Sequence, residues 1–357
     1  MKAITIEKVN GEPGHVYYPL KLIDIPQPSP QPTEVKIKLL AAALNHRDHF
    51  IRQHLYPGIS FDNIPLFADG IGIVTSTGLL VHRDWLGKRV LLAPGRGWRD
   101  SPDGPEGDSY GILGGTKHAP NGTLQEYICV PVSEVEEAPL HLDPIEAAGL
   151  PLCGLTAFRA VFTKAKVQAG QNILITGIGG GVALQALAFC AAAGAMVFVT
   201  SSSDQKLAAA KELGASAGVS YKKDGWNKEL KGLLPQSRPY LDAVIDGAGG
   251  DIAARTVPLL KKGGKIVSYG MTLGPQTPYT MQAVLKNIEI LGSTMGSRKE
   301  FAQMVEYVRH KQLRTVVSRV VEGISIESIE PLFAELKEGR QFGKLVVRIA
   351  SEENSKL

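Results

Sequence analysis

Short segments in which polar and apolar residues alternate mark the beginning of the chain. Residues 2–6 (KAITI) and 34–39 (EVKIKL) have this period of two, which is typical of strands with one buried face. The proline-rich run 25–32 between them excludes a central strand. Further strand-like segments follow at 69–74, 87–92 and 123–130. Because no helical pattern of any length precedes residue 45, we expect a β-rich region here.

The pattern changes in the middle of the chain, where apolar runs alternate with helical stretches. The apolar runs are 173–175, 196–199, 218–221, 241–246, 264–268 and 288–291. Such alternation predicts a parallel, doubly wound sheet with helices on its faces. In the helix expected at 204–213, Ser202 and Gln205 are spaced as a capping box. We therefore expect an α/β protein.

The tail of the chain has a mixed pattern. Helical patterns cover 300–310 and 327–338, and a strand pattern covers 343–349. The changes of pattern divide the chain into regions 1–131, 132–296 and 297–357.

The strand, turn and helix at 173–193 are the most informative stretch. The apolar strand ILI leads into the glycine-rich turn TGIGGG and then into an Ala/Leu-rich helix. In the spacing Gly177-x-x-Gly180-x-x-Ala183, the glycines permit a tight turn and a close approach of phosphate oxygens, and the alanine permits close packing. A flexible surface turn is the alternative. The flanking strand and helix favour a dinucleotide-binding turn, with the pyrophosphate at the helix N-terminus.

Composition and charge narrow the class of protein. The chain has 357 residues, of which 44% are hydrophobic and 21% charged, as expected of a globular protein with two domains. The net charge of +4 argues against a dedicated nucleic-acid-binding protein. We find no membrane-spanning run and no signal-peptide core, and the three cysteines lie far apart. We expect a cytoplasmic protein that binds neither membranes nor nucleic acid.

Candidate chemistry in the β-rich region is concentrated in ALNHRDHFIR at 43–52 and in the tyrosine that follows. Asp48 is a candidate catalytic residue of this segment, which also contains Asn45 and is followed by Tyr56. The alternative for Asp48 is a buried acid that holds the turn. The segment 94–122 is rich in Gly, Pro and Asp and long for a loop. It is either a solvated insert or a lid that brings Trp98 and Tyr110 to a pocket.

Six motifs together carry a resemblance to a known family. They are ALNHRD at 43–48, ADGIGIV at 68–74, GTLQEY at 122–127, LPLCGLTA at 150–157, ITGIGGGVA at 175–183 and KELGA at 211–215. The chain resembles the medium-chain dehydrogenase/reductase superfamily, and most closely its zinc-free quinone oxidoreductase branch. The resemblance implies a GroES-like catalytic domain, formed by 1–131 and completed by 297–357, and a Rossmann dinucleotide-binding domain at 132–296.

The resemblance also locates the positions at which zinc-dependent relatives bind their metal. Asn45 stands where those relatives carry Cys, and Ala68-Asp69 stand where they carry His-Glu. Cys153 matches the third ligand position. One thiolate beside an amide and a methyl group cannot form a catalytic zinc site. Residues 90–122 also contain no Cys for a structural zinc lobe, so we expect no metal.

The residues after the second strand of the α/β region indicate which nicotinamide binds. NAD specificity usually needs an acid there. This chain has three serines and then Lys206, which suit a 2′-phosphate, and the resemblance adds a phosphate-contacting tyrosine at Tyr221. We therefore predict NADPH as the cofactor. The predicted cofactor-binding residues are Thr156, Gly177, Gly179, Gly180, Gly181, Val182, Ala183, Ser201, Ser202, Ser203, Lys206, Tyr221 and Gly270.

Without a Lewis acid, hydrogen bonds must stabilise charge on the substrate oxygen, with Asn45 and Tyr56 as candidate donors. We therefore predict a zinc-independent NADPH-dependent oxidoreductase that transfers a hydride to a quinone or an α,β-unsaturated carbonyl. The alternative is a non-catalytic NADPH-binding protein with a structural or RNA-binding role, as some members of the resembled branch have. For the predicted oxidoreductase, the expected partner is a small-molecule substrate. The family habit of dimerising predicts a homodimer, with 288–292 as a sheet edge.

Overall fold

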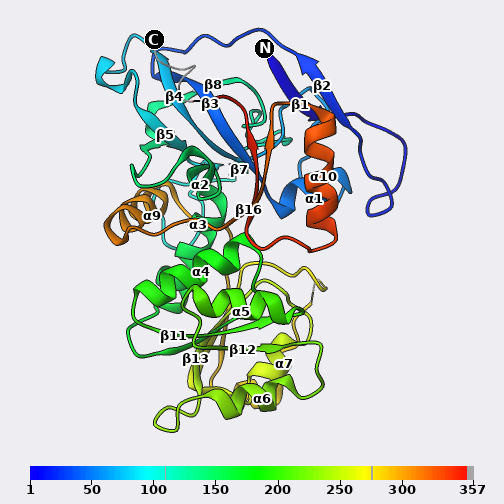
Figure 1. Cartoon of the computed structure of the whole chain (residues 1–357), viewed down its shortest axis with the longest axis vertical. Coiled ribbons are helices and arrows are strands. Elements are labelled where there is room, and N and C mark those ends of the chain that lie inside the picture. Colours follow the sequence, from blue (N-terminus) through cyan, green and yellow to red (C-terminus); the bar gives the residue numbers. More distant parts are fainter. Residues whose placement is uncertain (109, 275, 352–357) are drawn as a thin grey trace. The chain divides into compact units, whose positions relative to one another are not determined.

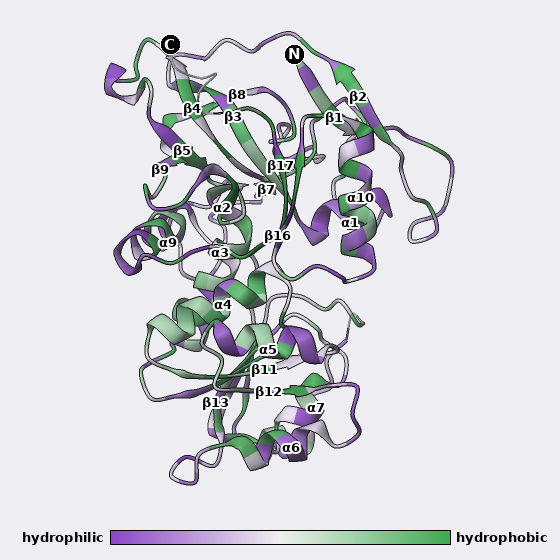
Figure 2. Cartoon of the chain, in the orientation of Figure 1, coloured by the Kyte–Doolittle hydropathy of each residue, from purple (hydrophilic) through white to green (hydrophobic). Residues whose placement is uncertain are grey.

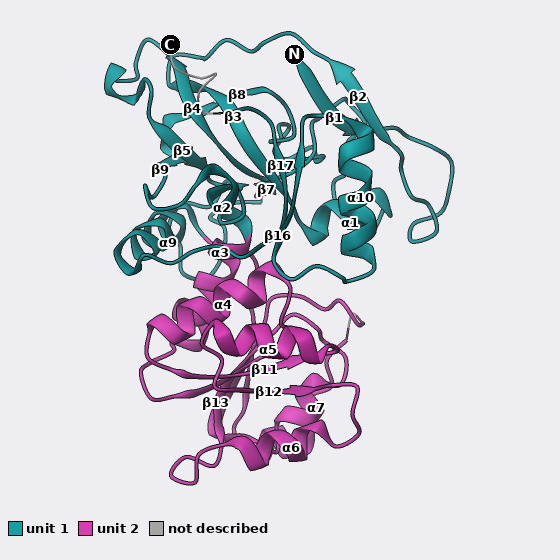
Figure 3. Cartoon of the chain, in the orientation of Figure 1, with its two compact units in different colours: residues 1–152, 297–357 teal, residues 153–296 magenta. Residues whose placement is uncertain are grey.

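The chain forms two compact units in the computed structural model, which describes residues 1–108, 110–274 and 276–351. The first unit is Met1–Leu152 with Ser297–Leu357, and the second is Cys153–Gly296 (Figure 3). Residues 132–152, which the sequence pattern assigned to the α/β region, belong to the first unit. In the described part of the chain, no helix has the length and apolar character needed to cross a membrane.

A seven-stranded sheet forms the frame of the first unit (Figure 1). Its order is β16-β17-β3-β4-β5-β9, and β8 also pairs with β3. The strands are β3 (Glu34–Leu44), β4 (Asp69–Thr77), β5 (Arg89–Leu92), β8 (Tyr127–Pro131), β9 (Val135–Glu137), β16 (Val317–Glu322) and β17 (Lys344–Arg348). Antiparallel pairing of β17 with β3 sets Leu345 opposite Leu44, so the end of the chain completes the sheet. A separate ribbon pairs β1 (Lys2–Ile6) with β2 (Leu20–Asp24).

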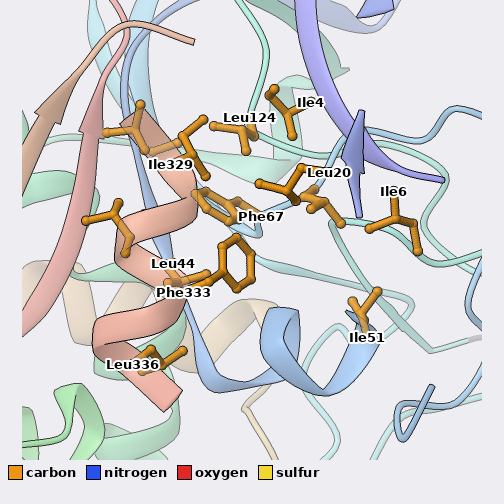
Figure 4. Close-up of a cluster of buried hydrophobic side chains, with 14 of the residues drawn as sticks. Ile4, Ile6, Leu20, Leu44, Ile51, Phe67, Leu124, Ile329, Phe333 and Leu336 are labelled. Atoms are coloured by element: carbon orange, nitrogen blue, oxygen red, sulfur yellow. The ribbon is translucent and has the colours of Figure 1, made fainter. Parts of the chain in front are cut away.

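Each of the four helices of the first unit contributes buried residues. They are α1 (His46–Arg52), α2 (Pro144–Ala148), α9 (Arg298–Lys311) and α10 (Ile326–Lys337). In Figure 2, α10 carries both hydrophobic and hydrophilic segments, as expected of a half-buried helix. Its Phe333 joins Phe67 and Leu44 in a buried apolar cluster, with the two aromatic ring centroids 6.1 Å apart (Figure 4). Ile51 of α1 belongs to the same cluster, so α1 packs on this core.

A six-stranded parallel sheet forms the frame of the second unit. Its order is β12-β11-β10-β13-β14-β15, and every neighbouring pair is parallel. The strands are β10 (Asn172–Ile175), β11 (Met196–Ser201), β12 (Ala217–Ser220), β13 (Leu241–Asp246), β14 (Leu260–Ser268) and β15 (Glu289–Gly292). The central strands β10 and β13 are buried throughout, because helices cover a parallel sheet on both faces.

The helices of the second unit connect these strands in the expected alternation. They are α4 (Gly181–Ala192), α5 (Asp204–Glu212), α6 (Trp226–Leu233), α7 (Ile252–Thr256) and α8 (Met281–Leu285). The helix α3 (Pro151–Phe158) precedes the sheet and continues as a π-helix over Arg159–Ala165. The predicted α/β fold, with a β-rich part and a doubly wound parallel sheet, is confirmed.

Candidate active site

The polar residues predicted at 43–52 lie where β3 ends and α1 begins. Asn45 is the N-cap of α1, and its backbone N–H donates to Asp48 Oδ2 at 2.9 Å. This bond is half of a capping box, in which the carboxylate satisfies a backbone donor at the start of the helix. Both residues are buried. The local sequence therefore brings two of the predicted catalytic residues together.

Lys344, the first residue of β17, reaches the same place from the far end of the chain. Its Nζ donates to Leu44 O at 2.9 Å, to Asn45 Oδ1 at 2.6 Å and to Asp69 Oδ2 at 2.9 Å. The Lys344 side chain is 3% exposed and that of Asp69 is fully buried. We call Asn45, Asp69 and Lys344 the Lys344 cluster. It consists of a buried ion pair, Lys344 with Asp69, and the Asn45 amide, which hydrogen-bonds both charged groups.

Asp69 is held by donors on both of its carboxylate oxygens. Oδ1 accepts the backbone N–H of Leu152 at 2.6 Å, and Oδ2 accepts the Asn45 side-chain amide at 2.8 Å as well as the lysine. Two residues earlier, Phe67 has a left-handed backbone with φ of +65°. A bulky residue in this region is strained, and here the surrounding core holds it. The buried carboxylate is therefore compensated by charge and by hydrogen bonds.

Sequence reasoning does not identify Lys344. In GKLVVRI the lysine precedes an apolar run, and such a lysine is ordinarily the exposed end of a strand. Lys344 is buried only because β17 pairs with β3, a strand about 300 positions away in the sequence. No local pattern carries that information.

Asp48 is the most strongly perturbed carboxyl of this region. Burial raises the pKa of Asp48 from 3.8 to about 6, although the charges of Arg47 and Lys344 and the hydrogen bond from Asn45 lower it. Its Oδ1 lies 3.5 Å from Arg47 Nη1 and has no hydrogen-bond partner among the described residues. A carboxyl with such a pKa can gain and lose a proton close to neutral pH.

Arg47 connects α1 to Tyr56 and to the long loop. Its guanidinium donates to Leu113 O at 2.6 Å and to Gly114 O at 3.0 Å. It also lies over the Tyr56 ring, 4.6 Å from the centroid, and Tyr56 packs half-buried against the core. The third predicted catalytic residue therefore shares a neighbour, Arg47, with Asp48. The geometry does not place the Tyr56 hydroxyl on the Lys344 cluster.

The segment 94–122, which the structure describes except for residue 109, makes contacts within itself. It contains a short ribbon, β6 (Gly95–Arg96) paired with β7 (Gly111–Ile112). The rings of Trp98 and Tyr110 meet edge to face with centroids 5.7 Å apart, and Trp98 Nε1 donates to Ser101 O at 2.8 Å. These two aromatics pack on each other, and whether the segment acts as a lid stays a prediction.

The glycine turn of the second unit has the backbone that its sequence predicts. Gly177 and Gly179 have φ of +65° and +125°, and Gly180 is the N-cap of α4, which begins at Gly181. A Cβ added at Gly177 would meet nothing within 4 Å, so backbone conformation rather than space calls for glycine there. The backbone N–H of Gly177 donates to Thr200 Oγ1 at 3.2 Å, which ties the turn to β11. The free N–H groups of a helix N-terminus suit a pyrophosphate.

The predicted 2′-phosphate residues lie just after β11. Ser201 Oγ accepts the Ser203 N–H at 3.2 Å, and Ser203 Oγ caps α5 by accepting the Lys206 N–H at 3.4 Å. The capping box expected at Ser202 is therefore wrong by one residue, because Ser203 has the extended backbone of an N-cap. Ser202 is exposed, and Tyr221, whose N–H donates to Ser201 O, is 41% exposed.

The remaining predicted cofactor residues are spread over the same unit. Val182 and Ala183 lie in the first turn of α4, and Ala183 is buried. Gly270 follows β14, and its carbonyl accepts the Ser268 hydroxyl at 3.2 Å. The Thr156 hydroxyl, on α3, contacts Met295 Sδ at 3.6 Å. The glycine turn and the serines follow adjacent strands of one sheet, whereas Gly270 follows a strand two positions away from β10.

Asp246, at the end of β13, is a further candidate that sequence reasoning missed. Its Oδ1 accepts the Thr176 hydroxyl at 2.6 Å and the Ala248 N–H at 3.0 Å, and its Oδ2 accepts the Gly249 N–H at 3.0 Å. Burial raises the pKa of Asp246, and these donors lower it. The signal in the sequence is an acid that ends a buried strand before GAGG. It braces the turn that begins at Thr176.

The Lys344 cluster does not supply the ligands of a catalytic zinc ion. Asn45 presents an amide, Ala68 a methyl group, and both oxygens of Asp69 already accept N–H donors. A catalytic zinc takes three Cys, His or carboxylate ligands and leaves one position open. In the parts of the chain that the structure describes, no group of three or more His, Cys, Asp or Glu side chains is placed to hold a metal ion.

Comparison with known proteins covers both units. Residues 31–140 match the family of the alcohol dehydrogenase GroES-like domain, and residues 181–309 match the zinc-binding dehydrogenase family. The zinc-type alcohol dehydrogenase-like protein YogA of Leptosphaeria maculans is 50% identical over 355 residues, which cover 97% of this chain and 99% of that protein. The acryloyl-coenzyme A reductase of Sulfurisphaera tokodaii is 24% identical over 92% of this chain and 96% of its own.

A solved structure agrees with these matches. The crystal structure of an NAD-dependent alcohol dehydrogenase has a TM-score of 0.85 and 31% sequence identity, and the likeness covers 98% of this chain and 100% of that one. The GroES-like domain and the Rossmann domain expected from the motifs are thereby confirmed. The chain belongs to the medium-chain dehydrogenase/reductase family of nicotinamide-dependent oxidoreductases.

Proposed function

We propose that this protein is a zinc-independent NADPH-dependent oxidoreductase that transfers a hydride to a quinone or an α,β-unsaturated carbonyl. The observation that carries the proposal is the Lys344 cluster. An ammonium 2.9 Å from Asp69 Oδ2 opposes the approach of a second cation to that carboxylate. The amide of Asn45 and the methyl group of Ala68 offer no replacement ligands. The predicted absence of zinc thus has support from the side chains that are present.

The proposed substrate class follows from the groups that can stabilise negative charge on the substrate oxygen when no metal ion is bound. Without a Lewis acid, hydrogen bonds must carry the negative charge that develops on the substrate oxygen, and a conjugated acceptor spreads that charge. The relative from Sulfurisphaera tokodaii, an acryloyl-coenzyme A reductase by name, is in keeping with such an acceptor. The bound nicotinamide would supply the hydride.

We assign three residues to the handling of the substrate oxygen. Tyr56 is a hydroxyl donor, and the Arg47 guanidinium lies over its ring, 4.6 Å from the centroid. Asn45 acts as an oriented amide dipole, held between Lys344 and Asp69. Asp48 fixes the first turn of α1, and with a pKa of about 6 it can gain and lose a proton close to neutral pH.

NADPH is the proposed cofactor because its 2′-phosphate suits the residues after β11. Ser201, Ser202 and Ser203 bring hydroxyls and no acid, and Lys206 adds a positive charge. The glycine turn at Gly177–Gly181 would receive the pyrophosphate. Thr156, Val182, Ala183, Tyr221 and Gly270 complete the proposed set.

A cytoplasmic homodimer is the proposed working form. Its support is that β15 ends the parallel sheet of the second unit, and that Met281 and Leu285 on the preceding helix are 70% and 73% exposed. The three cysteines, Cys129, Cys153 and Cys190, are not joined in disulfides, as is usual in a reducing compartment.

The experiment that tests the function is NADPH oxidation by the purified protein across a panel of quinones, 2-alkenals, enones and enoyl thioesters. We expect saturable, substrate-dependent oxidation with at least one member, and the same rate after dialysis against a zinc chelator. Tight NADPH binding without turnover of any member would contradict the proposal and favour a non-catalytic NADPH-binding protein.

A further inference from the structure

The ammonium of Lys344 sits in a cage of three oxygens that come from two distant parts of the first unit. Leu44 O and Asn45 Oδ1 lie at 2.9 and 2.6 Å, and Asp69 Oδ2 at 2.9 Å. An ammonium has three N–H donors, and each of these oxygens is within hydrogen-bond distance. The aliphatic stem is enclosed too, because a Cβ added at Gly149 would lie 3.0 Å from Lys344 Cγ. The chain therefore carries a fixed positive charge inside this unit.

This charge determines the orientation of the Asn45 side chain. Asn45 Oδ1 faces the ammonium, and Asn45 Nδ2 donates to Asp69 Oδ2 at 2.8 Å. Turning the amide by 180° would set its NH₂ group against the ammonium and its oxygen against the carboxylate. Both contacts would then be repulsive in a buried site, where charges are poorly screened. Lys344 and Asp69 together leave the amide one orientation.

We propose that Lys344 is a positioning residue of the active site, a built-in cation that locks the Asn45 amide and so fixes the polar pattern at the N-cap of α1. This inference rests on the proposed reductase function, in which Asn45 acts on the substrate oxygen as an oriented dipole. The two charges lie 2.9 Å apart, and the Asn45 amide hydrogen-bonds each of them, so the charges and the amide form one unit. Lys344 acts through Asn45 and is not itself assigned a contact with substrate.

Two variants separate positioning from simple stabilisation. K344M keeps an unbranched side chain, one heavy atom shorter than lysine, and removes its charge, which leaves Asp69 without its counter-ion. D69N/K344M removes both charges. The new amide at position 69 can still accept from Leu152 N–H, and it can donate to Asn45 Oδ1 only if the Asn45 amide turns around. The double variant thus has no stranded charge and the opposite amide orientation.

K286M is a matched control in the second unit. Lys286 Nζ donates to three backbone carbonyls, those of Val257, Pro258 and Leu260, at 3.0, 2.9 and 2.7 Å. It therefore resembles Lys344 as an ammonium among three oxygens, but none of its partners is a side chain. We expect K286M to lower the unfolding midpoint and to leave kcat unchanged.

The measurements are the unfolding midpoint, the Kd for NADPH and the kcat with the best substrate of the panel. K344M should lower kcat by about 100-fold and leave the Kd for NADPH within about twofold, as expected when a reacting group is misplaced. D69N/K344M should regain most of the lost midpoint but not the lost kcat. If the double variant, or a stably folded K344M, keeps kcat within about threefold of wild type, the positioning role is overturned.

A readout without turnover keeps the inference separate from the proposed function. If the wild-type protein turns over no substrate, the function fails, and the orientation of Asn45 can still be tested. In protein labelled with ¹⁵N-asparagine, a locked Asn45 amide should exchange its protons with water at least 100-fold more slowly than the exposed Asn10, by the logic of protection. N45D identifies the signal by its loss. Exchange of Asn45 at the rate of Asn10 would contradict the lock.

Discussion

The Lys344 cluster of the first unit is formed by charged and polar side chains, whereas the glycine turn of the second unit is formed by backbone. The Lys344 cluster consists of a charged pair and an amide, and Asn45 and Lys344 are 299 residues apart in the sequence. The glycine turn consists of backbone from a few consecutive residues, in which Gly177 and Gly179 adopt positive φ. The first site depends on side-chain charge that long-range pairing buries. The second depends on the absence of side chains, so the two should respond differently to substitution.

The largest effect is expected from stranding a charge in the first unit. K344M leaves Asp69 buried and unpaired, which should cost about 3–5 kcal/mol of the free energy of unfolding. Because two compact units can unfold separately, hydrogen exchange in β3 and β17 gives the local value. K286M should leave exchange in these strands unchanged. A cost in β3 and β17 no larger than that of an exposed substitution would mean that Asp69 does not need its lysine.

The next largest effect is a pH dependence that comes from Asp48. Its pKa is about 6 in the folded chain and near 3.8 in the unfolded one, so the folded state binds the proton more tightly. The free energy of unfolding should therefore fall as pH rises from about 4 to 6, by about 3 kcal/mol, and stay level above that window. Asn45, Arg47, Lys344 and Asp69 are the other groups that act on this carboxyl.

D48N should remove this slope, since an amide does not titrate there. D84N is the control, because Asp84 is an exposed acid of the same unit with 79% of its side chain accessible. A pH slope that persists in D48N would assign the titration to another group.

In the second unit, adding a methyl group at Gly177 should weaken NADPH binding more than it lowers the stability of the fold. G177A forces an alanine into φ of +65°, which costs about 1–2 kcal/mol of backbone strain, and its Cβ would stand where phosphate oxygens approach. The Kd for NADPH should rise at least about 10-fold, measured by fluorescence titration. G225A is matched, because Gly225 has φ of +73° and equally open surroundings. It should lose similar stability and keep its affinity, and equal losses of affinity would remove the phosphate role from Gly177.

The smallest effect concerns the choice between the two nicotinamides. K206E replaces a charge that attracts the 2′-phosphate with one that repels it, so the Kd for NADPH should rise about 10-fold, or about 1.4 kcal/mol, while the Kd for NADH changes little. K228E, on an exposed position of α6, is the control. Equal affinity of the wild type for NADPH and NADH would contradict the assignment.

The glycine turn could be predicted from the sequence, whereas the Lys344 cluster could not. The turn at Gly177–Gly181, the parallel sheet and the family are encoded in short stretches with a fixed period or spacing, so they are readable without a fold. The N-cap of α5 was misplaced by one residue, because Ser202 and Ser203 are chemically alike and only backbone geometry separates them.

The role of Lys344 could not be predicted, because it depends on the register of β17 against β3. The contact of Asp246 with Thr176 is hidden for a similar reason, since Thr176 follows β10 and lies 70 positions away in the sequence. Asn45 is predictable as a site residue from the resemblance, because it stands at a metal-ligand position of zinc-dependent relatives, and Asp48 from the crowded polar segment, but their partners are not predictable. Neither the local sequence motifs nor the long-range strand pairing identifies the substrate.

The most direct test of the central claim is the dependence of NADPH oxidation on zinc. Zinc content and turnover with the best conjugated acceptor are measured on the same samples, before and after chelation and after zinc is added back. The Lys344 cluster predicts that turnover is the same at every zinc content. Turnover that disappears with the metal and returns with it would contradict the account.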